Sequence, residues 1–153
     1  MKCIFGIENC KTLNNQYVKT DPYQFFIGYQ VFSSYYSRSA IESMGSRICE
    51  LIKLDLKELK IINKPFGFSD AIHIFCNACK LIQPSILCIF EISDSNPNVM
   101  LEIGKSQFKN IILLRNKSSD KKPPIDLGGI FYEEYDNEEE LITLKSAKIA
   151  HII

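Results

Sequence analysis

The sequence predicts a single α/β domain, in which a mostly parallel sheet of about five strands lies between two helical layers as a three-layer α/β/α sandwich. Strand-like and helix-like segments alternate along the chain, which is typical of parallel sheets with crossover helices. A nearly continuous apolar run at 86–92 indicates a central strand covered on both faces. The length of 153 residues, with 46% apolar and 24% charged residues, suits one domain spanning 1–153.

The first half of the chain contains two predicted strands and one predicted helix. Aromatic and β-branched residues at 23–29 predict a buried strand that ends at a glycine, and a short strand is expected at 59–62. Between them we expect a helix capped by Ser33 or Ser34, because apolar residues recur every three or four positions. These positions are Tyr36, Ala40, Ile41, Met44, Ile48, Leu51 and Ile52. Residues 1–20 are ambiguous, with a possible short strand at 2–7.

The second half continues the alternation. A helix that begins at Ser69 and runs to about residue 82 should end before Pro84. In the strand predicted at 86–92, only Glu91 interrupts the apolar run. Pro97 suits the first turn of the following helix, and 110–114 predicts another strand. The last expected elements are a strand at 129–132 and a helix at 137–150.

Composition and charge disfavour several classes of function. The 18 basic and 18 acidic residues are scattered along the chain, whereas a nucleic-acid-binding protein usually shows a basic stripe. No run reaches the ~20 apolar residues that a membrane helix needs. The first residues do not resemble a signal peptide, so we expect a cytosolic protein. The P-loop and the G-x-S-x-G nucleophile elbow are both absent from the sequence.

The six cysteines are expected to be reduced and buried rather than paired in disulfides. Cys76 and Cys79 have the spacing of a metal-ligand pair, but the other cysteines and the two histidines do not complete a zinc pattern. We therefore expect no metal and no cofactor, and we interpret this pair as part of a helix face.

The strongest candidate for a functional site is the segment ISDSNPNVMLEIG at 92–104. Short polar side chains that could bind hydroxyl groups follow the end of a strand, at Asp94, Ser95, Asn96 and Asn98. A helix begins next, and the free N–H groups of its first turn favour anionic ligands. Glu102 shares a helix face with Asn98, and its carboxylate could attack or stabilise the anomeric carbon of a sugar. The alternative is that Asp94 and Asn96 only cap the helix and that Glu102 is solvated.

The second candidate is the segment FIGYQVF at 26–32. Gly28 could let a ligand approach the backbone, while Tyr29 and Phe32 could stack on a base. The alternative is that these aromatic rings belong to the core and that Gly28 only makes a turn. Both candidate segments follow strand ends. In a parallel sheet such ends share one edge, so we expect the two segments to lie side by side near a topological switch point.

Taken together, FIGYQVF, CIFEIS, DSNPNVMLEIGKS and NIILL resemble the nucleoside 2-deoxyribosyltransferase-like family and its TIR-like nucleotide-processing relatives, over roughly residues 23–135. The resemblance implies a flavodoxin-like sheet, a nucleoside or nucleotide as small-molecule partner, and a homo-oligomer. It gives Glu102 the role of attacking or stabilising the anomeric carbon during N-glycosidic cleavage, and it places Tyr29 near the base. Asn96 and Ser85 stand where the family has acidic residues, and Asp94 is the residue that could compensate for Asn96.

The leading hypothesis is an enzyme that cleaves or transfers at an N-glycosidic bond, either a deoxyribosyltransferase or a glycohydrolase, with NAD among the candidate substrates. Glu102 and Asp94 are the candidate catalytic residues. The candidate substrate-binding residues are Gly28, Tyr29, Phe32, Ser95, Asn96 and Asn98. One rival is a non-catalytic nucleotide-binding or sensing module, of the kind found among relatives in bacterial antiviral defence systems. Another is a domain that serves mainly for protein association.

Overall fold

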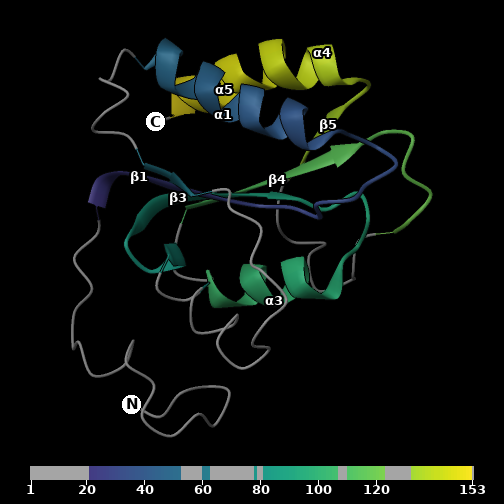
Figure 1. Cartoon of the computed structure of the whole chain (residues 1–153), viewed down its shortest axis with the longest axis horizontal. Helices are drawn as coiled ribbons and strands as arrows, with labels where there is room; N and C mark the ends of the chain where they lie inside the picture. Colours follow the sequence, from purple (N-terminus) through teal and green to yellow (C-terminus); the bar gives the residue numbers. More distant parts are fainter. Residues whose placement is uncertain are drawn as a thin grey trace, which may run out of the picture.

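The structure is a computed structural model, and it describes residues 21–52, 60–62, 78, 81–106, 110–122 and 132–152. Within these ranges the chain forms a parallel sheet between two layers of helices (Figure 1). The strands are β1 (Asp21–Gly28), β2 (Lys60–Ile62), β3 (Ser85–Glu91), β4 (Asn110–Asn116) and β5 (Tyr132–Tyr135). The predicted three-layer α/β fold class is confirmed.

The sheet has the strand order β2-β1-β3-β4-β5, and every neighbouring pair is parallel. This is the order of a flavodoxin-like doubly wound sheet, in which the edge strand β2 contributes only three residues. The order reverses between β1 and β3, where Gly28 pairs with Phe90. The chain leaves β1 toward one face of the sheet and β3 toward the other, which makes this pair the topological switch point.

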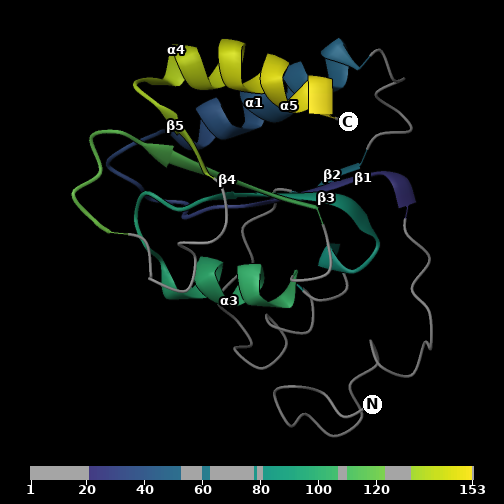
Figure 2. The same cartoon turned by 180° about the vertical axis from the view of Figure 1, so that it is seen from behind.

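Two helical layers cover the sheet. Helix α1 (Arg38–Leu51) packs on one face beside a carboxy-terminal helical segment made of α4 (Glu138–Glu140), the π-helix η2 (Leu141–Lys145) and α5 (Ser146–Ile152). Helix α3 (Pro97–Lys105) covers the opposite face, as the views from the front and from behind both show (Figure 1, Figure 2). Within the described ranges, no helix is long and apolar enough to cross a membrane.

Helix α1 begins later than the sequence predicts. Its N-cap is Ser37, whose hydroxyl accepts a hydrogen bond from the Ala40 N–H at 3.2 Å, so the predicted caps Ser33 and Ser34 are wrong. The reason is that Tyr36 is held by the loop after β1, through hydrogen bonds with the backbone of Gln30. The chain therefore becomes helical only after residue 37.

Alternate residues of β3 enter two different cores, which explains its continuous apolar run. Leu87 and Ile89 pack with α1 and the carboxy-terminal helical segment, whereas Cys88 and Phe90 pack with α3. Cys49 and Cys88 are buried, as predicted, while the other four cysteines lie outside the described residues. Among the described residues no cluster of side chains is suited to bind a metal ion.

The carboxy-terminal part differs in detail from the predicted elements. Strand β5 runs to Tyr135, further along the chain than the strand predicted at 129–132, of which only Tyr132 is described. Its central residues, Glu133 and Glu134, are charged and pair with basic side chains, so the apolar signal is weak. The helix predicted at 137–150 is present but includes a π-helical turn. The predicted strand at 2–7 and most of the helix predicted at 69–82 lie outside the described residues.

Candidate functional site

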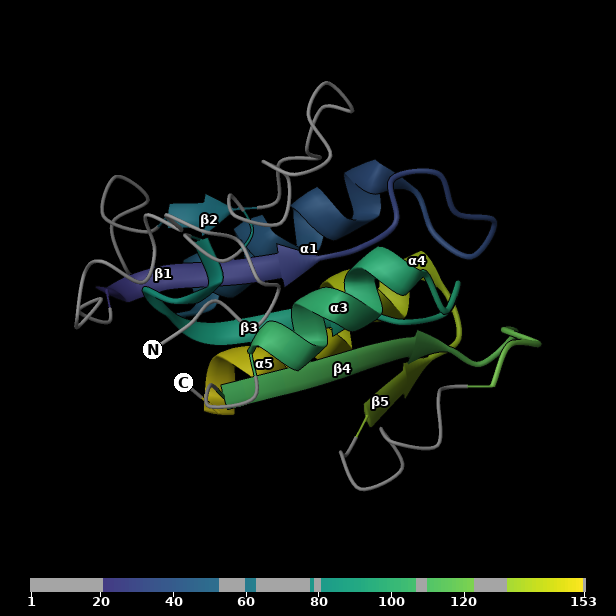
Figure 3. The same cartoon turned by 90° about the horizontal axis from the view of Figure 1, so that it is seen from below.

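Three loops meet at the carboxyl edge of the sheet, following β1, β3 and β4 (Figure 3). The Asn96 side-chain N–H donates to the Gln30 side-chain oxygen at 2.8 Å, which joins the first loop to the second. The Ser119 hydroxyl donates to the Ser93 carbonyl at 2.6 Å, which joins the second loop to the third. The two candidate segments therefore lie side by side, as the topology led us to expect.

Glu102 lies on the face of α3 that covers the end of β1. A methyl group added at Gly28 would lie 2.8 Å from the Glu102 Oε2 atom and 2.5 Å from the Phe90 ring. Glycine suits the end of β1, because the Phe90 ring and, beside it, the Glu102 carboxylate occupy the space that a Cβ atom would need. The half-buried carboxylate of Glu102 stands at the switch point of the sheet.

Asn96 is the N-cap of α3. Its side-chain oxygen accepts hydrogen bonds from the N–H groups of Asn98 and Val99, and the Met100 N–H donates to its carbonyl. The expectation that this helix offers free N–H groups to an anion is therefore wrong at these positions. The physical reason is that asparagine is one of the best N-cap residues. Asn96 thus acts as a helix cap, which was the alternative interpretation of this residue. The Asn98 side chain is exposed to solvent.

Asp94 and Ser95 form the turn between β3 and α3. The Asp94 Oδ2 atom is buried and has no hydrogen-bond partner among the described residues. A buried acceptor in this state is unfavourable unless a ligand or solvent supplies a donor. Ser95 adopts a positive φ of 51°, and its hydroxyl lies 3.5 Å from the Lys122 carbonyl. Lys121 donates from its ammonium group to the Asp94 carbonyl at 3.3 Å.

The two aromatic residues of the first loop occupy different environments. The Tyr29 ring packs edge-on against Tyr36, with centroids 6.5 Å apart, and joins the core on the α1 side of the sheet. Burial raises the pKa of Tyr29, opposed by the neighbouring Arg38. Tyr29 therefore packs against the core, which was the alternative interpretation of these aromatic residues. Phe32 is 86% exposed, an unusual state for a phenylalanine, and its carbonyl accepts a hydrogen bond from the Gln30 side chain at 2.6 Å.

A buried acid lies beneath these loops, and sequence reasoning did not assign it to the site. Glu91, the last residue of β3, is 2% exposed. Its carboxylate accepts hydrogen bonds from the Ser93 N–H at 3.1 Å, from the Ser93 hydroxyl, and from the Tyr135 hydroxyl at 3.1 Å. Burial raises the pKa of Glu91 to about 7, although hydrogen bonds from Ser93, Tyr135 and Tyr36 act in the opposite direction. The sequence does contain a signal for this buried acid, because Glu91 is the single acidic residue within the apolar run at 86–92.

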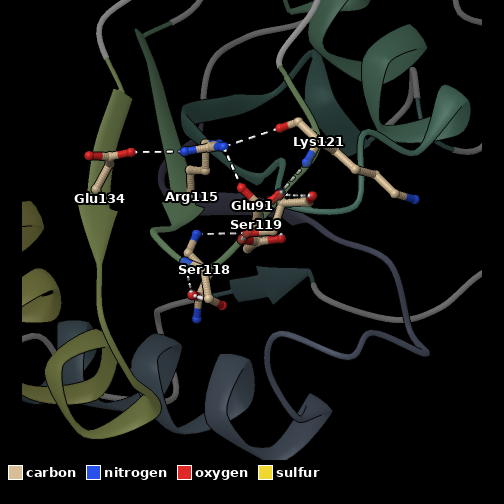
Figure 4. A network of polar contacts seen from close by, with 8 residues as sticks. Glu91, Arg115, Ser118, Ser119, Lys121 and Glu134 are labelled. Atoms are coloured by element: carbon tan, nitrogen blue, oxygen red, sulfur yellow. Dashed lines mark hydrogen bonds and ion pairs between the residues drawn. The ribbon is translucent and has the colours of Figure 1, made fainter.

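The loop after β4 is held by Arg115 (Figure 4). The guanidinium pairs with Glu134 on β5 at 2.9 Å and donates to the carbonyls of Ser119 and Lys121 at 2.8 and 3.2 Å. The N–H of Asn116 donates to the Ser93 hydroxyl at 2.7 Å, and so connects this loop with the Glu91 cluster. The third loop is thus ordered by side chains from β4 and β5.

Ser85 does not take part in the site. It lies at the amino end of β3, fully buried, and its hydroxyl donates to the Leu81 carbonyl at 2.7 Å and accepts from Gln24 at 3.0 Å. Glu102 lies at the other end of the same sheet. Ser85 is therefore a structural residue in this fold.

No family model matches the sequence, and no curated protein matches it either. Among solved structures, the chain is similar to the Clostridium botulinum CMP N-glycosidase BcmB, with a TM-score of 0.51 and 20% sequence identity. The match covers 85% of this chain and 99% of that chain. At this identity the comparison shows a shared fold, the parallel α/β sandwich described above.

Proposed function

We propose that this protein binds a nucleoside or nucleotide at the carboxyl edge of the sheet and cleaves its N-glycosidic bond. The observation that carries the proposal is the position of Glu102, whose carboxylate lies over Gly28 at the switch point between β1 and β3. Open α/β sheets bind their ligands in the crevice at this point. The fold shared with an N-glycosidase supports the same class of chemistry.

We assign to Glu102 the role of acting on the anomeric carbon, at which the bond breaks. When the bond between the anomeric carbon and the base nitrogen breaks, its electron pair leaves with the base, which then takes up a proton. The anomeric carbon becomes positively charged, and a carboxylate can stabilise it or bond to it. In a hydrolase, a water molecule then bonds to that carbon through its oxygen, any bond to Glu102 breaks, and the proton that the water gives up balances the one that the base takes up. In a transferase, a nitrogen of a second base attacks that carbon in place of the water.

The neighbouring residues are assigned to binding. The Asp94 Oδ2 atom, a buried acceptor without a partner among the described residues, would accept a hydrogen bond from a sugar hydroxyl. Phe32 offers an exposed ring on which a base could stack. Ser95 and Asn98 line the same loop and helix start. The bare backbone at Gly28 lets the Glu102 carboxylate lie close to the end of β1. Asn96 serves the framework as the cap of α3.

The test is release of free base. The purified protein is incubated separately with CMP, NAD and 2′-deoxynucleosides, and the products are separated by chromatography. Wild type should release base from at least one of them, and Glu102→Gln should not. Glu50→Gln is the matched control, because Glu50 is an exposed glutamate on α1 that pairs with Arg47, away from the carboxyl edge. Equal release by wild type and Glu102→Gln would refute the assignment.

A second candidate is a module that binds a nucleotide without cleaving it. The observation in its favour is that Asn96 supplies an amide, already engaged with α3 and Gln30, where the resembling family has an acid. Binding of CMP or NAD by calorimetry, without any free base, would select this function. If the protein neither binds these nucleotides nor releases free base, a domain that serves for protein association is favoured.

A further inference from the structure

The loop after β4, at 117–122, is tied to the turn that bears Asp94. Three successive residues of that turn, at 93–95, each form a hydrogen bond with the loop. The bonded pairs are Ser93 with Ser119, Asp94 with Lys121, and Ser95 with Lys122, at 2.6, 3.3 and 3.5 Å. The third loop, which sequence reasoning did not include in the site, therefore helps to fix the position of Asp94.

Lys121 is held along its whole length. Its carbonyl accepts a hydrogen bond from the Arg115 guanidinium at 3.2 Å, and its N–H donates to the Ser119 hydroxyl at 3.3 Å. The side chain extends away from Arg115 (Figure 4), and the ammonium donates to the Asp94 carbonyl at 3.3 Å. A long exposed side chain has much conformational entropy to lose, so an ammonium that is already held beside Asp94 is pre-organised to bind a ligand.

The charge of Lys121 is not used in an ion pair within the part of the chain that the structure describes. Two other cations of β4 and its loop do form such pairs. These are Arg115 with Glu134, and Lys117 with Asp136, at 2.9 and 2.7 Å. Asp120, the acid next to Lys121, accepts a hydrogen bond from the Tyr35 hydroxyl at 2.7 Å. The Lys121 ammonium contacts a neutral carbonyl instead, so its charge is available to an anionic ligand.

Asp94 and Lys121 call for two different ligand groups. The Asp94 Oδ2 atom is buried and has no donor among the described residues, so it favours a neutral donor such as a hydroxyl. An ammonium has three N–H groups, and those not used by the Asp94 carbonyl favour anionic acceptors such as phosphate oxygens. The ammonium also offsets part of the negative charge of Asp94. A ligand that satisfies both residues carries a hydroxyl and an anionic group close together.

The topology sets the direction in which a sugar would lie. Glu102 stands over Gly28, which pairs with Phe90, whereas Asp94 comes later in the chain, past the end of β3. Because β4 is parallel to β3, α3 runs back along the sheet, and Glu102 lies deeper than the turn. In a 5′-nucleotide the anomeric carbon is at one end of the sugar, and the 3′-hydroxyl and 5′-phosphate are toward the other. With the anomeric carbon at Glu102, these two groups would face Asp94 and Lys121.

We propose that Lys121 and Asp94 select a nucleoside 5′-phosphate with a free 3′-hydroxyl, an inference that rests on the proposed function for the place of the sugar. Lys121 binds the phosphate, and Asp94 accepts a hydrogen bond from the 3′-hydroxyl. A nucleoside lacks the first contact, and a 3′-deoxynucleotide lacks the second. The 2′-hydroxyl has no part in this selection, and the chemistry at Glu102 is unchanged by it.

The experiment measures dissociation constants by calorimetry for wild type, Lys121→Met and Lys117→Met. Lys117→Met is the matched control, because Lys117 is an exposed lysine of the same loop that pairs with Asp136. The ligands are CMP with cytidine and AMP with adenosine, so that a preference for one base does not decide the outcome. Wild type and Lys117→Met should bind at least one monophosphate about tenfold more tightly than its nucleoside, as expected for a charge-assisted hydrogen bond. In Lys121→Met this preference should disappear.

Deoxy forms of the preferred monophosphate test Asp94. Wild type should bind the 3′-deoxy form about tenfold more weakly than the monophosphate itself, because the buried acceptor is then left without a donor. The 2′-deoxy form should bind nearly as tightly as the monophosphate. In Asp94→Ala the 3′-deoxy form and the monophosphate should bind equally, since the acceptor is absent. Lys117→Met should again follow wild type.

Three results would each overturn the proposal. They are equal binding of monophosphates and nucleosides by wild type, a preference that persists in Lys121→Met, and a penalty on the 2′-deoxy rather than the 3′-deoxy form. Base release separates this inference from the proposed function. A preference that depends on Lys121, without free base, keeps the selection and refutes the cleavage. Free base released equally from monophosphates and nucleosides does the reverse, and both proposals fail if wild type binds none of these ligands.

Discussion

Replacement of Glu91 by glutamine should remove a pH-dependent loss of stability. The pKa of this carboxyl is about 7 in the folded protein, because it is buried, and near 4.5 when it is exposed. Between these values the folded state binds more protons than the unfolded state, so the free energy of unfolding decreases as the pH rises, and then levels off above pH 7. At 1.36 kcal/mol per pKa unit, the full loss is about 3 kcal/mol.

Glutamine is suited to this comparison because it has the shape of the neutral acid and does not titrate. The hydroxyls of Ser93 and Tyr135 can rotate to accept from its amide. Urea unfolding of both proteins is measured at several pH values from about 4.5 to 8. The free energy of unfolding of Glu91→Gln minus that of wild type should rise by about 3 kcal/mol across this range. Other carboxyl groups are common to both proteins and cancel in the difference.

The sign of this change is the critical outcome. A difference that stays constant with pH would mean that the ionised carboxylate is not penalised by its buried position. A difference that decreases with pH would mean that the hydrogen bonds from Ser93 and the tyrosines outweigh the loss of hydration.

Two further predictions concern the packing of the site. Gly28→Ala places a methyl group 2.5 Å from the Phe90 ring and 2.8 Å from Glu102, so thermal unfolding should show a loss of about 1–3 kcal/mol, typical of overpacking. An unchanged midpoint would contradict the close approach of Glu102 to β1. Asn96→Ala should lower the free energy of unfolding by about 1 kcal/mol or more through loss of the α3 cap and of the hydrogen bond to Gln30, whereas Asn96→Asp keeps the cap, loses only the bond to Gln30, and should cost less. Equal effects of the two substitutions in urea unfolding would argue against the capping role.

Much of the fold could be predicted because its signals are local. The run at 86–92 is apolar on both faces of one strand, and the strand–helix alternation implies parallel pairing. The two predictions that were wrong each have a physical cause. The cap of α1 was misplaced because Ser33, Ser34 and Ser37 are all suitable residues, and only the contact of Tyr36 with Gln30 selects among them. Strand β5 was displaced because its two glutamates depend on basic partners elsewhere in the chain.

The site was predictable at the level of topology but not of individual contacts. That the two loops share an edge follows from parallel pairing of β1 and β3. That the Asn96 amide is engaged could not be predicted, because its partner Gln30 lies far away in the sequence. The cluster around Glu91 draws on Tyr135, which is brought close only by the sheet order. The sequence shows Glu91 as the one charged residue in an apolar strand, but it does not show which residues contact it.

The strand order also bears on how the chain reaches this structure. Strands β3 and β4 are joined through α3 alone, whereas β1 finds its neighbour β3 only across a long intervening segment, with Phe25 beside Leu87. Pairing over a longer loop has a larger entropic barrier and is slower. We therefore expect β3, α3 and β4 to assemble first and β1 to dock later. Since the carboxyl ends of β1 and β3 lie side by side only after this docking, the proposed site would be completed at a late stage of folding.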